Sequence, residues 1–462
     1  MPVLSPDRPA PAAGRRPAGP RGNPLYGTIR DVRRNILDFV PKVAEEYGDL
    51  ARVRLLPGWY GYLLFHPRHY GHVLVDGSGR YSKDVVHFDV LSLLIGQSVV
   101  TLNGAPWKRR RQLAQPGFHR QRIARFGEVM TDSTNDMLDR WETLDRATPV
   151  DIELEMTRLT LGVATRTLLS VEFTGELDEV GKAFIDANRF MAARWVNPFA
   201  LWTVNMPTRP NRAFKRSLES LDEIVYKIIR ERRRDGGSGP DDLLAMLLEA
   251  RDEETGEGLT EPELRDEVMT IMIAGHETSS TALTWTWYLL SQNPHVQDKL
   301  ATELDEVLGG RTPTVADLPK LKYTRMVFDE ALRLYPPAYV IGRRATEDDE
   351  IDGFHIPKGA PVYLVPYVTH RHPEVWERPD EFDPDRFREV GPSARSKFAY
   401  IPFGAGPRFC MGASFALIEA QLILATVAQR YRMRLAPGAR PEPMPLVTIR
   451  PRAGMPMLIE PA

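Results

Sequence analysis

Apolar residues recur at helical spacing along much of the chain, and two segments carry this pattern most clearly. Over residues 413–431, Phe, Leu, Ile and Val side chains follow one another at helical intervals. A second helical pattern begins at Thr260-x-x-Glu263, which is a capping box, and runs to Pro294. About 30 residues at 1.5 Å each give roughly 45 Å, so this second helix is expected to cross the whole molecule.

Other segments predict strands and loops. Residues 48–75 alternate apolar and polar positions around Pro57-Gly58, which predicts a β-hairpin, and residues 350–365 predict a β-turn-β unit. Residues 87–100 are apolar but irregular, and they are expected to form a long loop that is covered or binds something. Residues 181–207 are rich in large apolar side chains, as a pair of core helices would be.

Composition and charge exclude several classes of protein. The formal net charge of −2, from 60 basic and 62 acidic residues, makes nucleic acid an unexpected partner. The single cysteine excludes an intrachain disulfide and any zinc or iron–sulfur site built on a cysteine pair, and it suits a reducing, cytoplasmic setting. Residues 1–24 contain seven prolines and no apolar core, so we expect a flexible tail rather than a signal peptide or membrane anchor. Residues 25–462 are then expected to form one domain.

The only cysteine, Cys410, lies in the run Phe403-Gly-Ala-Gly-Pro-Arg-Phe-Cys-Met-Gly412. Gly404 and Gly406 favour a tight turn, and the helix predicted from residue 413 places the sulfur at a helix N-terminus. Unpaired N–H groups and the helix dipole are expected to lower the pKa of a thiol there, which suits one axial bond to iron. The alternatives are an inert buried thiol, a dinucleotide-binding turn, which position 409 (Phe) does not fit, and a catalytic cysteine, for which no partner histidine is evident.

This run resembles the haem-binding signature of the cytochromes P450, the haem-thiolate monooxygenases, at six fixed positions. Within the long predicted helix, Ala274-Gly-His-Glu-Thr-Ser279 is similar to the oxygen-activating motif of the same family. Gly275 and Thr278 are poor helix formers, so a local distortion or the close approach of a ligand is expected here. The resemblance implies a mostly α fold with a small β-rich region.

The resemblance also implies the cofactor and its contacts. The cofactor is expected to be haem b, with Cys410 as the iron ligand. Trp107 and Arg111 lie four residues apart on one helix face, and their indole and guanidinium N–H groups suit a haem propionate, although a solvated basic helix would look similar. The further haem contacts implied are Phe403, Gly404, Arg408 and Arg343, with Arg344 as the alternative to Arg343.

Further roles follow from the resemblance. Glu277 and Thr278 are expected to deliver protons, and a buried network of Glu330, Arg333 and Arg386 is expected to lock the loop that precedes Cys410. The substrate pocket is expected to be lined by Phe88, Leu91, Leu94, Ala274, Val340 and Ile341. These side chains are apolar, so terpenoid, steroid or fatty-acyl substrates are expected, in that order.

We therefore expect a monooxygenase that uses O2 and electrons from a separate ferredoxin or flavodoxin to hydroxylate or epoxidise a hydrophobic molecule. A small acidic donor is expected to dock on a basic surface of Lys108, Arg109, Arg110, Arg120, Arg122 and Arg125, and the protein is expected to be a monomer. Two alternatives stay open, a peroxide-driven peroxygenase and a haem sensor or carrier. The family's dedicated peroxygenases replace the acid–alcohol pair, which is intact here.

Overall fold

The computed structural model describes residues 14–172, 177–195, 200–234, 242–252, 255–388 and 396–462. Part of the predicted tail, residues 14–24, contacts the β-rich region, because the Ala18 carbonyl accepts a hydrogen bond from the N–H of Arg52 (2.9 Å) and Arg15 forms a bridge with Phe354. Residues 1–13 and the predicted break at residues 236–240 lie outside the described residues.

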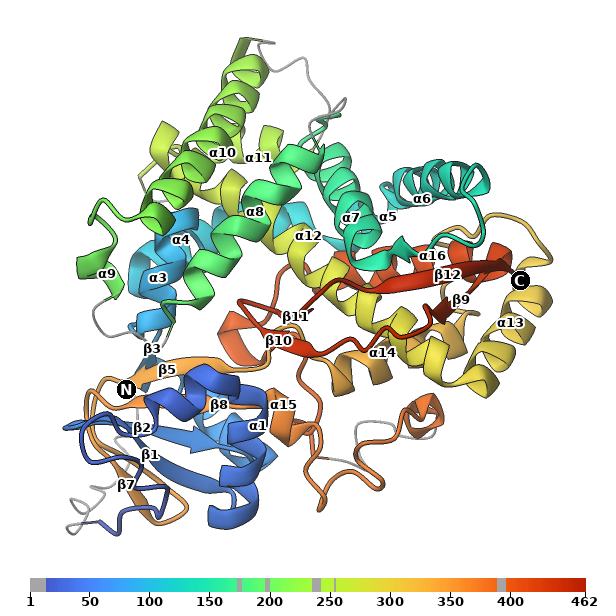
Figure 1. Cartoon of the computed structure of the whole chain (residues 1–462). Coiled ribbons are helices and arrows are strands. Elements are labelled where there is room, and N and C mark those ends of the chain that lie inside the picture. Colours follow the sequence, from blue (N-terminus) through green and yellow to red (C-terminus); the bar gives the residue numbers. More distant parts are fainter. Residues whose placement is uncertain (1–13, 173–176, 196–199, 235–241, 253–254, 389–395) are drawn as a thin grey trace, which may run out of the picture.

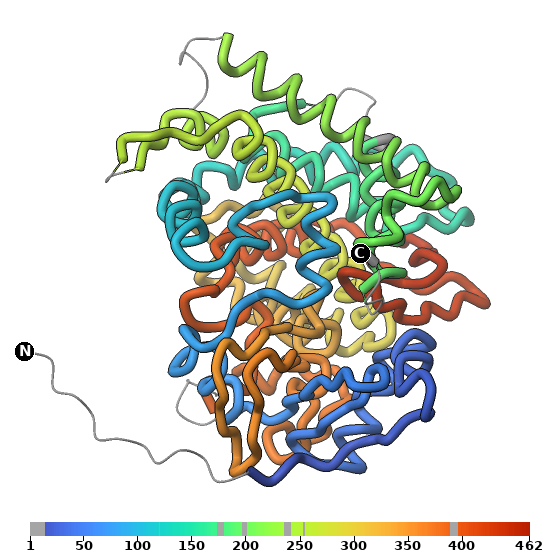
Figure 2. Tube along the Cα trace, turned by 90° about the vertical axis from the view of Figure 1, so that its left-hand side faces the viewer, coloured from blue at the N-terminus to red at the C-terminus, as the bar shows by residue number. Residues whose placement is uncertain are grey.

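Helices form most of the molecule and a smaller β-rich region lies below them, with α12 running through the helical part (Figure 1). The helices are α1 (Ile29–Tyr47), α2 (Pro67–Gly71), α3 (Val86–Ile95), α4 (Gly104–Ala114), α5 (Arg120–Ala124), α6 (Gly127–Glu142), α7 (Ile152–Leu168), α8 (Leu177–Ala192), α9 (Ala200–Thr203), α10 (Arg209–Arg234), α11 (Leu243–Glu249), α12 (Glu261–Gln292), α13 (Pro294–Leu308), α14 (Lys322–Leu334), α15 (Pro366–Thr369) and α16 (Ala413–Arg430). The same two-part arrangement is seen after a turn of 90° (Figure 2).

The strands form small sheets. They are β1 (Leu50–Leu56), β2 (Trp59–Leu64), β3 (Tyr81–Ser82), β4 (Val150–Asp151), β5 (Ile341–Ala345), β6 (Asp349–Ile351), β7 (Phe354–Ile356), β8 (Pro361–Leu364), β9 (Tyr431–Leu435), β10 (Pro443–Pro445), β11 (Ile449–Pro451) and β12 (Pro456–Pro461). The largest sheet has the order β1-β2-β8-β5-β3, and it contains the predicted β1–β2 hairpin. In this sheet β5 pairs with β8, with Arg343 opposite Val362, which fixes where the Arg343 backbone lies.

Helix α12 is the central element. The Thr260 side chain accepts from the N–H of Glu263 while the Glu263 side chain accepts from the N–H of Thr260, which confirms the predicted capping box. The predicted distortion near Gly275 is absent, because α12 continues without a break over its 32 residues. Gly275 instead allows close packing on α7, since a Cβ at this position would lie 3.3 Å from the Cβ of Ala164.

The prediction of a loop over residues 87–100 was wrong in its first half. Residues 86–95 form α3. The helix ends at Gly96, whose φ of 60° lies in the left-handed region. The N-cap residue of α3, Val85, has no side chain that can accept a hydrogen bond from the first turn. The helix therefore lacks the capping residue by which its beginning is recognised in a sequence. Packing against α12 and α8 stabilises α3 instead.

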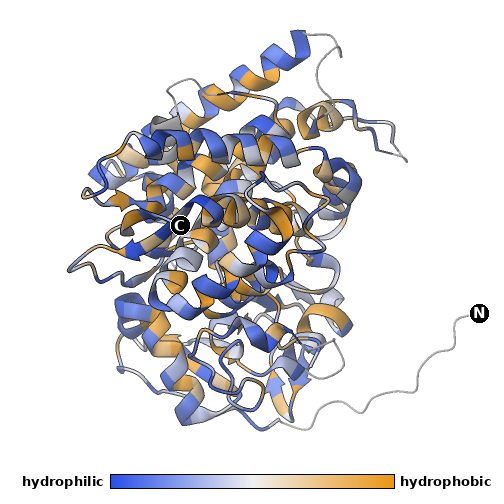
Figure 3. Cartoon of the chain, turned by 90° about the vertical axis from the view of Figure 1, so that its right-hand side faces the viewer, coloured by the Kyte–Doolittle hydropathy of each residue, from blue (hydrophilic) through white to orange (hydrophobic). Residues whose placement is uncertain are grey.

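The outermost helix, α10, has strips of apolar residues between polar ones along its length, as the hydropathy colours show for the topmost helix of Figure 3. Phe214, Leu221, Val225 and Ile229 are buried on its inner side, where α10 packs against α8 and α12. Basic side chains occupy much of the remaining surface of this helix.

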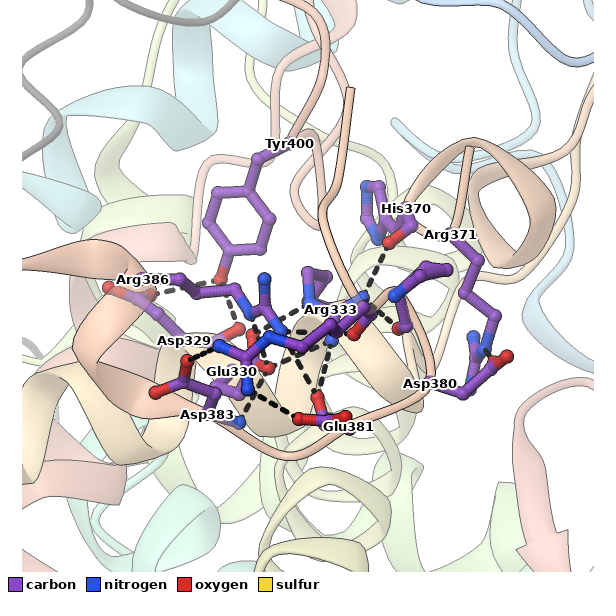
Figure 4. Close-up of polar contacts among 12 residues, drawn as sticks. Asp329, Glu330, Arg333, His370, Arg371, Asp380, Glu381, Asp383, Arg386 and Tyr400 are labelled. Atoms are coloured by element: carbon purple, nitrogen blue, oxygen red, sulfur yellow. Dashed lines mark hydrogen bonds and ion pairs between the residues drawn. The ribbon is translucent and has the colours of Figure 1, made fainter. Parts of the chain in front are cut away.

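The predicted network of Glu330, Arg333 and Arg386 is present and buried. Glu330 Oε1 accepts from Arg386 Nε (2.9 Å) and Arg333 Nη2 (2.8 Å), and Glu330 Oε2 accepts from Arg333 Nε (2.7 Å) (Figure 4). Glu330 and Arg333 are both 0% exposed. Arg333 also donates to the backbone carbonyl of His370 (2.8 Å).

This network holds the chain that leads to Cys410. The His370 ring accepts a hydrogen bond at Nε2 from the N–H of Ile401 (3.1 Å), and the Tyr400 hydroxyl donates to Asp329 (3.0 Å). The α14 ion pair, residue 370 and residues 400–401 therefore form one continuous set of contacts that ends shortly before the cysteine loop (Figure 4).

We expect Arg333→Met to lower the free energy of unfolding by about 3–5 kcal/mol, because it leaves the Glu330 carboxylate buried with fewer compensating donors. The matched control is Arg434→Met, which removes an exposed ion pair with Glu460 far from this network and should change stability by less than about 0.5 kcal/mol. Urea unfolding followed by circular dichroism measures both. Equal losses in the two variants would contradict a special role for the buried pair.

Candidate active site

The loop that presents Cys410 depends on two glycines in the left-handed region. Gly404 has a φ of 73° and Gly406 a φ of 68°. A Cβ on Gly406 would lie 1.9 Å from the Leu74 carbonyl oxygen, so no other residue fits there without moving the backbone. The N–H of Cys410 donates to the Phe403 carbonyl (3.0 Å), and α16 begins three residues later at Ala413. The predicted turn, cysteine and helix are confirmed in this order.

The expected lowering of the Cys410 thiol pKa is not found. Burial by the surrounding protein raises the pKa of this thiol, and the backbone N–H groups of Gly412 and Ala413 with the charge of Arg111 offset only part of that effect. The side chain is nevertheless open to solvent, so it borders a space rather than the packed core. A metal cation that binds there displaces the thiol proton, which is how ligation overcomes a raised pKa.

One face of α12 also borders open space. Ala274 and Thr278, four residues apart, are exposed, whereas Met272, His276 and Ser279 around them are buried. The Thr278 hydroxyl donates to the Ala274 carbonyl (3.0 Å), which keeps it on this face. Thr278 therefore has the exposure that the predicted role in proton delivery requires.

Four cationic side chains gather next to the cysteine loop: Lys83, Arg111, Arg343 and Arg408. Arg111 donates to the Phe409 carbonyl (3.1 Å), Arg408 to the Leu102 carbonyl (2.9 Å), Arg343 to the Gly342 carbonyl (2.8 Å) and Lys83 to the Val100 carbonyl (2.8 Å). Trp107 lies under this group, with its ring centroid 3.7 Å from the Arg408 guanidinium carbon. Arg344 points elsewhere, since it donates to the carbonyls of Asp84 and Gly359.

These cations destabilise one another. Burial, then repulsion by Arg343 and Arg111, lowers the pKa of Arg408 to about 10, and burial lowers that of Arg343 to about 10 as well. Burial, followed by repulsion from Arg343, Arg408 and Arg111, holds the pKa of Lys83 well below its ordinary value. In the part of the chain that the structure describes, no carboxylate forms an ion pair with any of the four.

This donor set fits haem. Buried cations without counter-charges cost free energy, and the two propionates of a haem would supply the missing negative charge directly beside the thiolate that would bind the iron. Arg111 links the cation group to the cysteine loop. It donates a hydrogen bond to the Phe409 carbonyl, and its charge lowers the pKa of Cys410. Phe403 and Gly404, also predicted to contact the haem, are half-buried in the same loop.

The residues predicted to line the substrate pocket are only partly gathered. An apolar cavity of about 100 Å³ is lined by Val340 together with Val32, Ile36, His87 and Trp195, among others. Ala274 is exposed beside Thr278, and the half-buried Phe88 lies 4.8 Å from the Lys83 ammonium, close to the cation group. Leu94 is only 1% exposed and packs in the main core, and the half-buried Leu91 packs against the edge of the same core. Ile341 packs against a second core, in the β-rich region.

Glu277 is held more firmly than a free proton carrier would be. Its carboxylate accepts from Asn188 Nδ2 (2.6 Å), Thr448 Oγ1 (2.7 Å) and Arg450 (Nε 2.9 Å, Nη2 2.5 Å), and only 4% of the residue is exposed. Burial alone would raise the pKa of Glu277, but the charge and hydrogen bonds of Arg450, with smaller effects of His276 and Thr448, outweigh it and bring the pKa to about 2.

Arg450 connects Glu277 to the surface. Its Nη1 donates to Glu153 Oε1 (2.8 Å), and both Glu153 and Arg450 line a cavity of about 270 Å³ that also includes Arg189 and Arg452. The chain of contacts from α12 through β11 to α7 therefore ends in a cavity that is large enough to hold water and is lined by both charged and apolar side chains. Glu277 does not line this cavity itself and is connected to it through Arg450.

The family model described as cytochrome P450 matches residues 17–455. The chain belongs to the cytochrome P450 family. Cyclooctatin synthase of Streptomyces melanosporofaciens is 36% identical to it over 446 residues, which cover 96% of this chain and 95% of that protein. Pentalenene oxygenase of Streptomyces avermitilis is 33% identical over 431 residues, which cover 93% of this chain and 94% of that protein.

The solved structure titled cytochrome P450DA heme domain is similar to this P450 with a TM-score of 0.87 and 29% identity, over 97% of this chain and 98% of that one. The predicted family and the mostly α fold are thus confirmed, and the chain is a haem-thiolate oxidoreductase of the monooxygenase type. Among the described residues, no helix combines the length and the apolar character needed to cross a bilayer.

The basic surface predicted for donor docking is corrected by the P450 structure. Arg110 is 5% exposed and contacts Glu263 (2.6 Å) and Glu267 (3.2 Å), and Arg109 donates to the Gly258 carbonyl (2.9 Å). Both arginines therefore tie α4 to the start of α12. Of the basic run in α4, only Lys108 is exposed, so the correction concerns Arg109 and Arg110.

A second group of potential metal ligands does not form a metal site. The ligand atoms of His66, His372 and Glu374 lie within 4.8 Å of one another. However, Nδ1 of His66 accepts from the N–H of Arg68 (3.1 Å) and Nδ1 of His372 from that of Glu374 (3.3 Å), which places the proton of each neutral ring on Nε2. The Nε2 atoms, which face the other potential ligands, therefore donate hydrogen bonds. Nε2 of His372 donates to Asp49 Oδ1 (3.1 Å).

Sequence reasoning missed Lys83, Asn188, Thr448, Arg450 and Glu153. Each belongs to a contact between segments far apart in the chain, such as the 173 residues that separate Glu277 from Arg450. A lone lysine before an apolar stretch and a lone arginine near the C-terminus carry no local pattern. In a strand, Val447, Ile449 and Pro451 would lie on the face opposite to Arg450, so the sequence carried no signal that this arginine is buried.

We expect Arg450→Met to lower the free energy of unfolding at pH 7 by about 3–5 kcal/mol, since Glu277 stays buried without its main partner. The matched control, Arg452→Met, loses an exposed pair with Glu442 and should change stability by less than about 0.5 kcal/mol.

The same pair of variants has a predicted pH dependence. In the unaltered protein the pKa of Glu277 is lowered from 4.5 to about 2, so stabilisation by the pair is complete above about pH 4.5 and is lost toward pH 2. In Arg450→Met burial dominates and raises the pKa of Glu277, so the variant gains stability as the pH falls from 7 to 4.5. The stability deficit should therefore narrow on acidification, and a deficit that stays constant from pH 7 to 4.5 would contradict the assignment.

Proposed function

We propose that this P450 binds haem b through Cys410 and inserts one oxygen atom of O2 into a hydrophobic terpenoid, giving an alcohol or an epoxide. The observation that supports this most is the group of Lys83, Arg111, Arg343 and Arg408, whose positive charge lies beside the only cysteine and matches the two carboxylates of that cofactor. When bound, the haem supplies O2 activation and the oxygen transfer itself.

The residues of α12 would manage protons and water. Thr278 places its hydroxyl on the exposed face of the helix, where it can hold a water molecule and pass on a proton. Glu277 would supply that proton. Because Arg450 keeps Glu277 ionised, the carboxylate has to leave Arg450 or take up a proton from water of the cavity beside Glu153 before each transfer.

A terpenoid substrate is favoured by two observations. Two relatives that carry terpenoids in their names, cyclooctatin synthase and pentalenene oxygenase, each match more than nine-tenths of the chain. The cavity lined by Val340 is apolar, with Phe39, Val40 and Trp195 on its wall, so a hydrocarbon skeleton with few polar groups would bind there without stranding a charge.

The electron donor would be a separate ferredoxin or flavodoxin. We further propose that the enzyme acts as a monomer in the cytoplasm. A peroxide-driven peroxygenase is less well supported, since Glu277 and Thr278 are both present, and a haem sensor would not need either residue.

Turnover separates these possibilities. The purified holoenzyme is supplied with NADPH, a ferredoxin and its reductase, together with a panel of cyclic terpenes, steroids and fatty acids under 18O2. We expect one 18O atom in a terpene product and electron-dependent activity. Product that takes up oxygen only from added hydrogen peroxide would support the peroxygenase. Substrate-induced spectral changes without any product would support the sensor.

We expect Thr278→Ala to keep haem content and substrate-induced spectral shifts but to lower product formed per NADPH by about tenfold, with the electrons recovered as hydrogen peroxide. Thr302→Ala is the matched control, because Thr302 makes the same hydrogen bond to the carbonyl four residues earlier (2.9 Å) on the exposed side of α13. Unchanged coupling combined with lost substrate affinity in Thr278→Ala would show that Thr278 is only part of the pocket wall.

A further inference from the structure

Among the described residues, four side chains with polar atoms line the apolar cavity of about 100 Å³: His87, Trp195, Tyr339 and Tyr363. The indole of Trp195 is satisfied, because its Nε1 donates to the His87 carbonyl (3.2 Å). The Tyr339 hydroxyl is satisfied as well, since it donates to the Leu446 carbonyl (2.9 Å). No described residue forms a hydrogen bond with the ring of His87 or with the hydroxyl of Tyr363. The wall of the cavity therefore has free hydrogen-bonding groups at two places.

These two free groups lie close together, and the fold fixes both. The ring centres of His87 and Tyr363 are 6.1 Å apart. The ring of His87 lies edge-on to that of Trp195, with 5.8 Å between centres, and packs on β5 so closely that a Cβ on Gly342 would collide with its Cε1. Tyr363 on β8 is paired opposite Gly342, and a Cβ on Gly61 would lie 3.1 Å from its Cε2. Glycines at these two positions thus leave room for both rings.

Both groups are uncharged at neutral pH. Burial, with repulsion by Arg343 and Lys83, lowers the pKa of His87 to about 3, and burial raises the pKa of Tyr363 to about 12. A neutral imidazole offers one donor and one acceptor, and a phenol offers both at one oxygen. A hydroxyl group can donate to one of them and accept from the other without bringing a charge into an apolar space. An ammonium group would be repelled by Arg343 and Lys83.

We propose that His87 and Tyr363 bind a hydroxyl group of the substrate, so that this P450 oxidises a terpenoid alcohol in preference to a terpene hydrocarbon. This inference rests on the proposed function and narrows its substrate class. The aliphatic wall of the cavity would take up the carbon skeleton, while the hydroxyl group replaces the water that the two side chains lose on binding. A hydrocarbon in the same place would leave both polar groups buried without a partner, which lowers its affinity.

A hydroxylated substrate also implies an order of reactions. Its oxygen has to be attached before the molecule reaches this enzyme, either by capture of water at the end of a terpene cyclisation or by an earlier oxygenation. Insertion of one atom of O2 into a further C–H bond then consumes two electrons from the donor and two protons, and it releases the other oxygen atom as water. The product of that step is a diol.

The test is the binding of compounds that share one skeleton to the ferric, haem-loaded protein. The first set is abietadiene, abietadienol and abietic acid, and the second is cedrane and cedrol. Changes in the Soret band with concentration give each dissociation constant. In the set that binds more tightly, we expect the alcohol to bind about tenfold more tightly than its hydrocarbon.

Variants assign this preference to the two side chains. His87→Leu should weaken binding of the alcohol about tenfold and Tyr363→Phe about threefold, while binding of the hydrocarbon changes less than about twofold. His87→Gln keeps a donor and an acceptor, so it should restore most of the affinity. Circular dichroism and haem content check folding, and Tyr363→Phe removes only one oxygen atom, so it tests the inference even if His87→Leu does not fold.

The matched controls are His295→Leu, at an exposed position of α13, and Tyr226→Phe on α10, and both should bind every compound like the unaltered protein. Equal affinity for alcohol and hydrocarbon, or losses in His87→Leu and Tyr363→Phe that are the same for both compounds, would overturn the inference and leave the proposed function standing. Tighter binding of the acid than of the alcohol would overturn it in favour of an anion attracted by Arg343 and Lys83. Absence of binding by every terpenoid would contradict the proposed function itself.

Discussion

Among the described residues, no carboxylate pairs with the positive charge gathered beside Cys410, and this shortage of negative charge shapes the surrounding structure. Lys83, Arg343 and Arg408 come from three distant parts of the chain, and packing brings them together although the charge of Arg343 lowers the pKa of both Lys83 and Arg408. Such an arrangement is unfavourable in isolation, so the fold has to supply the free energy that holds it. The contacts around Cys410 provide this free energy.

Two buried carboxylates, Glu330 and Glu277, illustrate how this is done. Glu330 is satisfied by Arg333, Arg386 and a backbone N–H, and Glu277 by Arg450, Thr448 and Asn188. Each pair is complete in hydrogen bonds, and each ties a long helix to a segment that borders the site. Both of these carboxylates have cationic partners, whereas the cations beside Cys410 have no carboxylate partner among the described residues, which supports a ligand-binding site there.

Local signals allowed much of the fold to be predicted. The capping box at Thr260 identified the start of α12, and the glycines around Cys410 identified the turn, because both features act between near neighbours. The first half of residues 87–100 could not be recognised as α3, since this helix has no cap and owes its stability to α8 and α12. Gly275 looked like a distortion because its packing partner, Ala164, lies on another helix.

The candidate site divides in the same way. Motif residues such as Cys410, Thr278 and Arg408 were identifiable from the sequence, whereas Lys83 and Arg450 were not, because their roles arise only from tertiary contacts. Arg109 and Arg110 show the opposite error, since a basic run looked like an open surface until Glu263 and Glu267 were found against it. Charge patterns alone cannot distinguish solvated cations from paired ones.

Ligation of the haem iron by Cys410 can be read from the spectrum of the reduced, CO-bound protein. We expect the red-shifted Soret band of thiolate ligation in the unaltered protein and its loss in Cys410→Ala, because the chain contains no other cysteine. Persistence of that band in Cys410→Ala, or its absence from haem-loaded unaltered protein, would show that Cys410 is not the iron ligand.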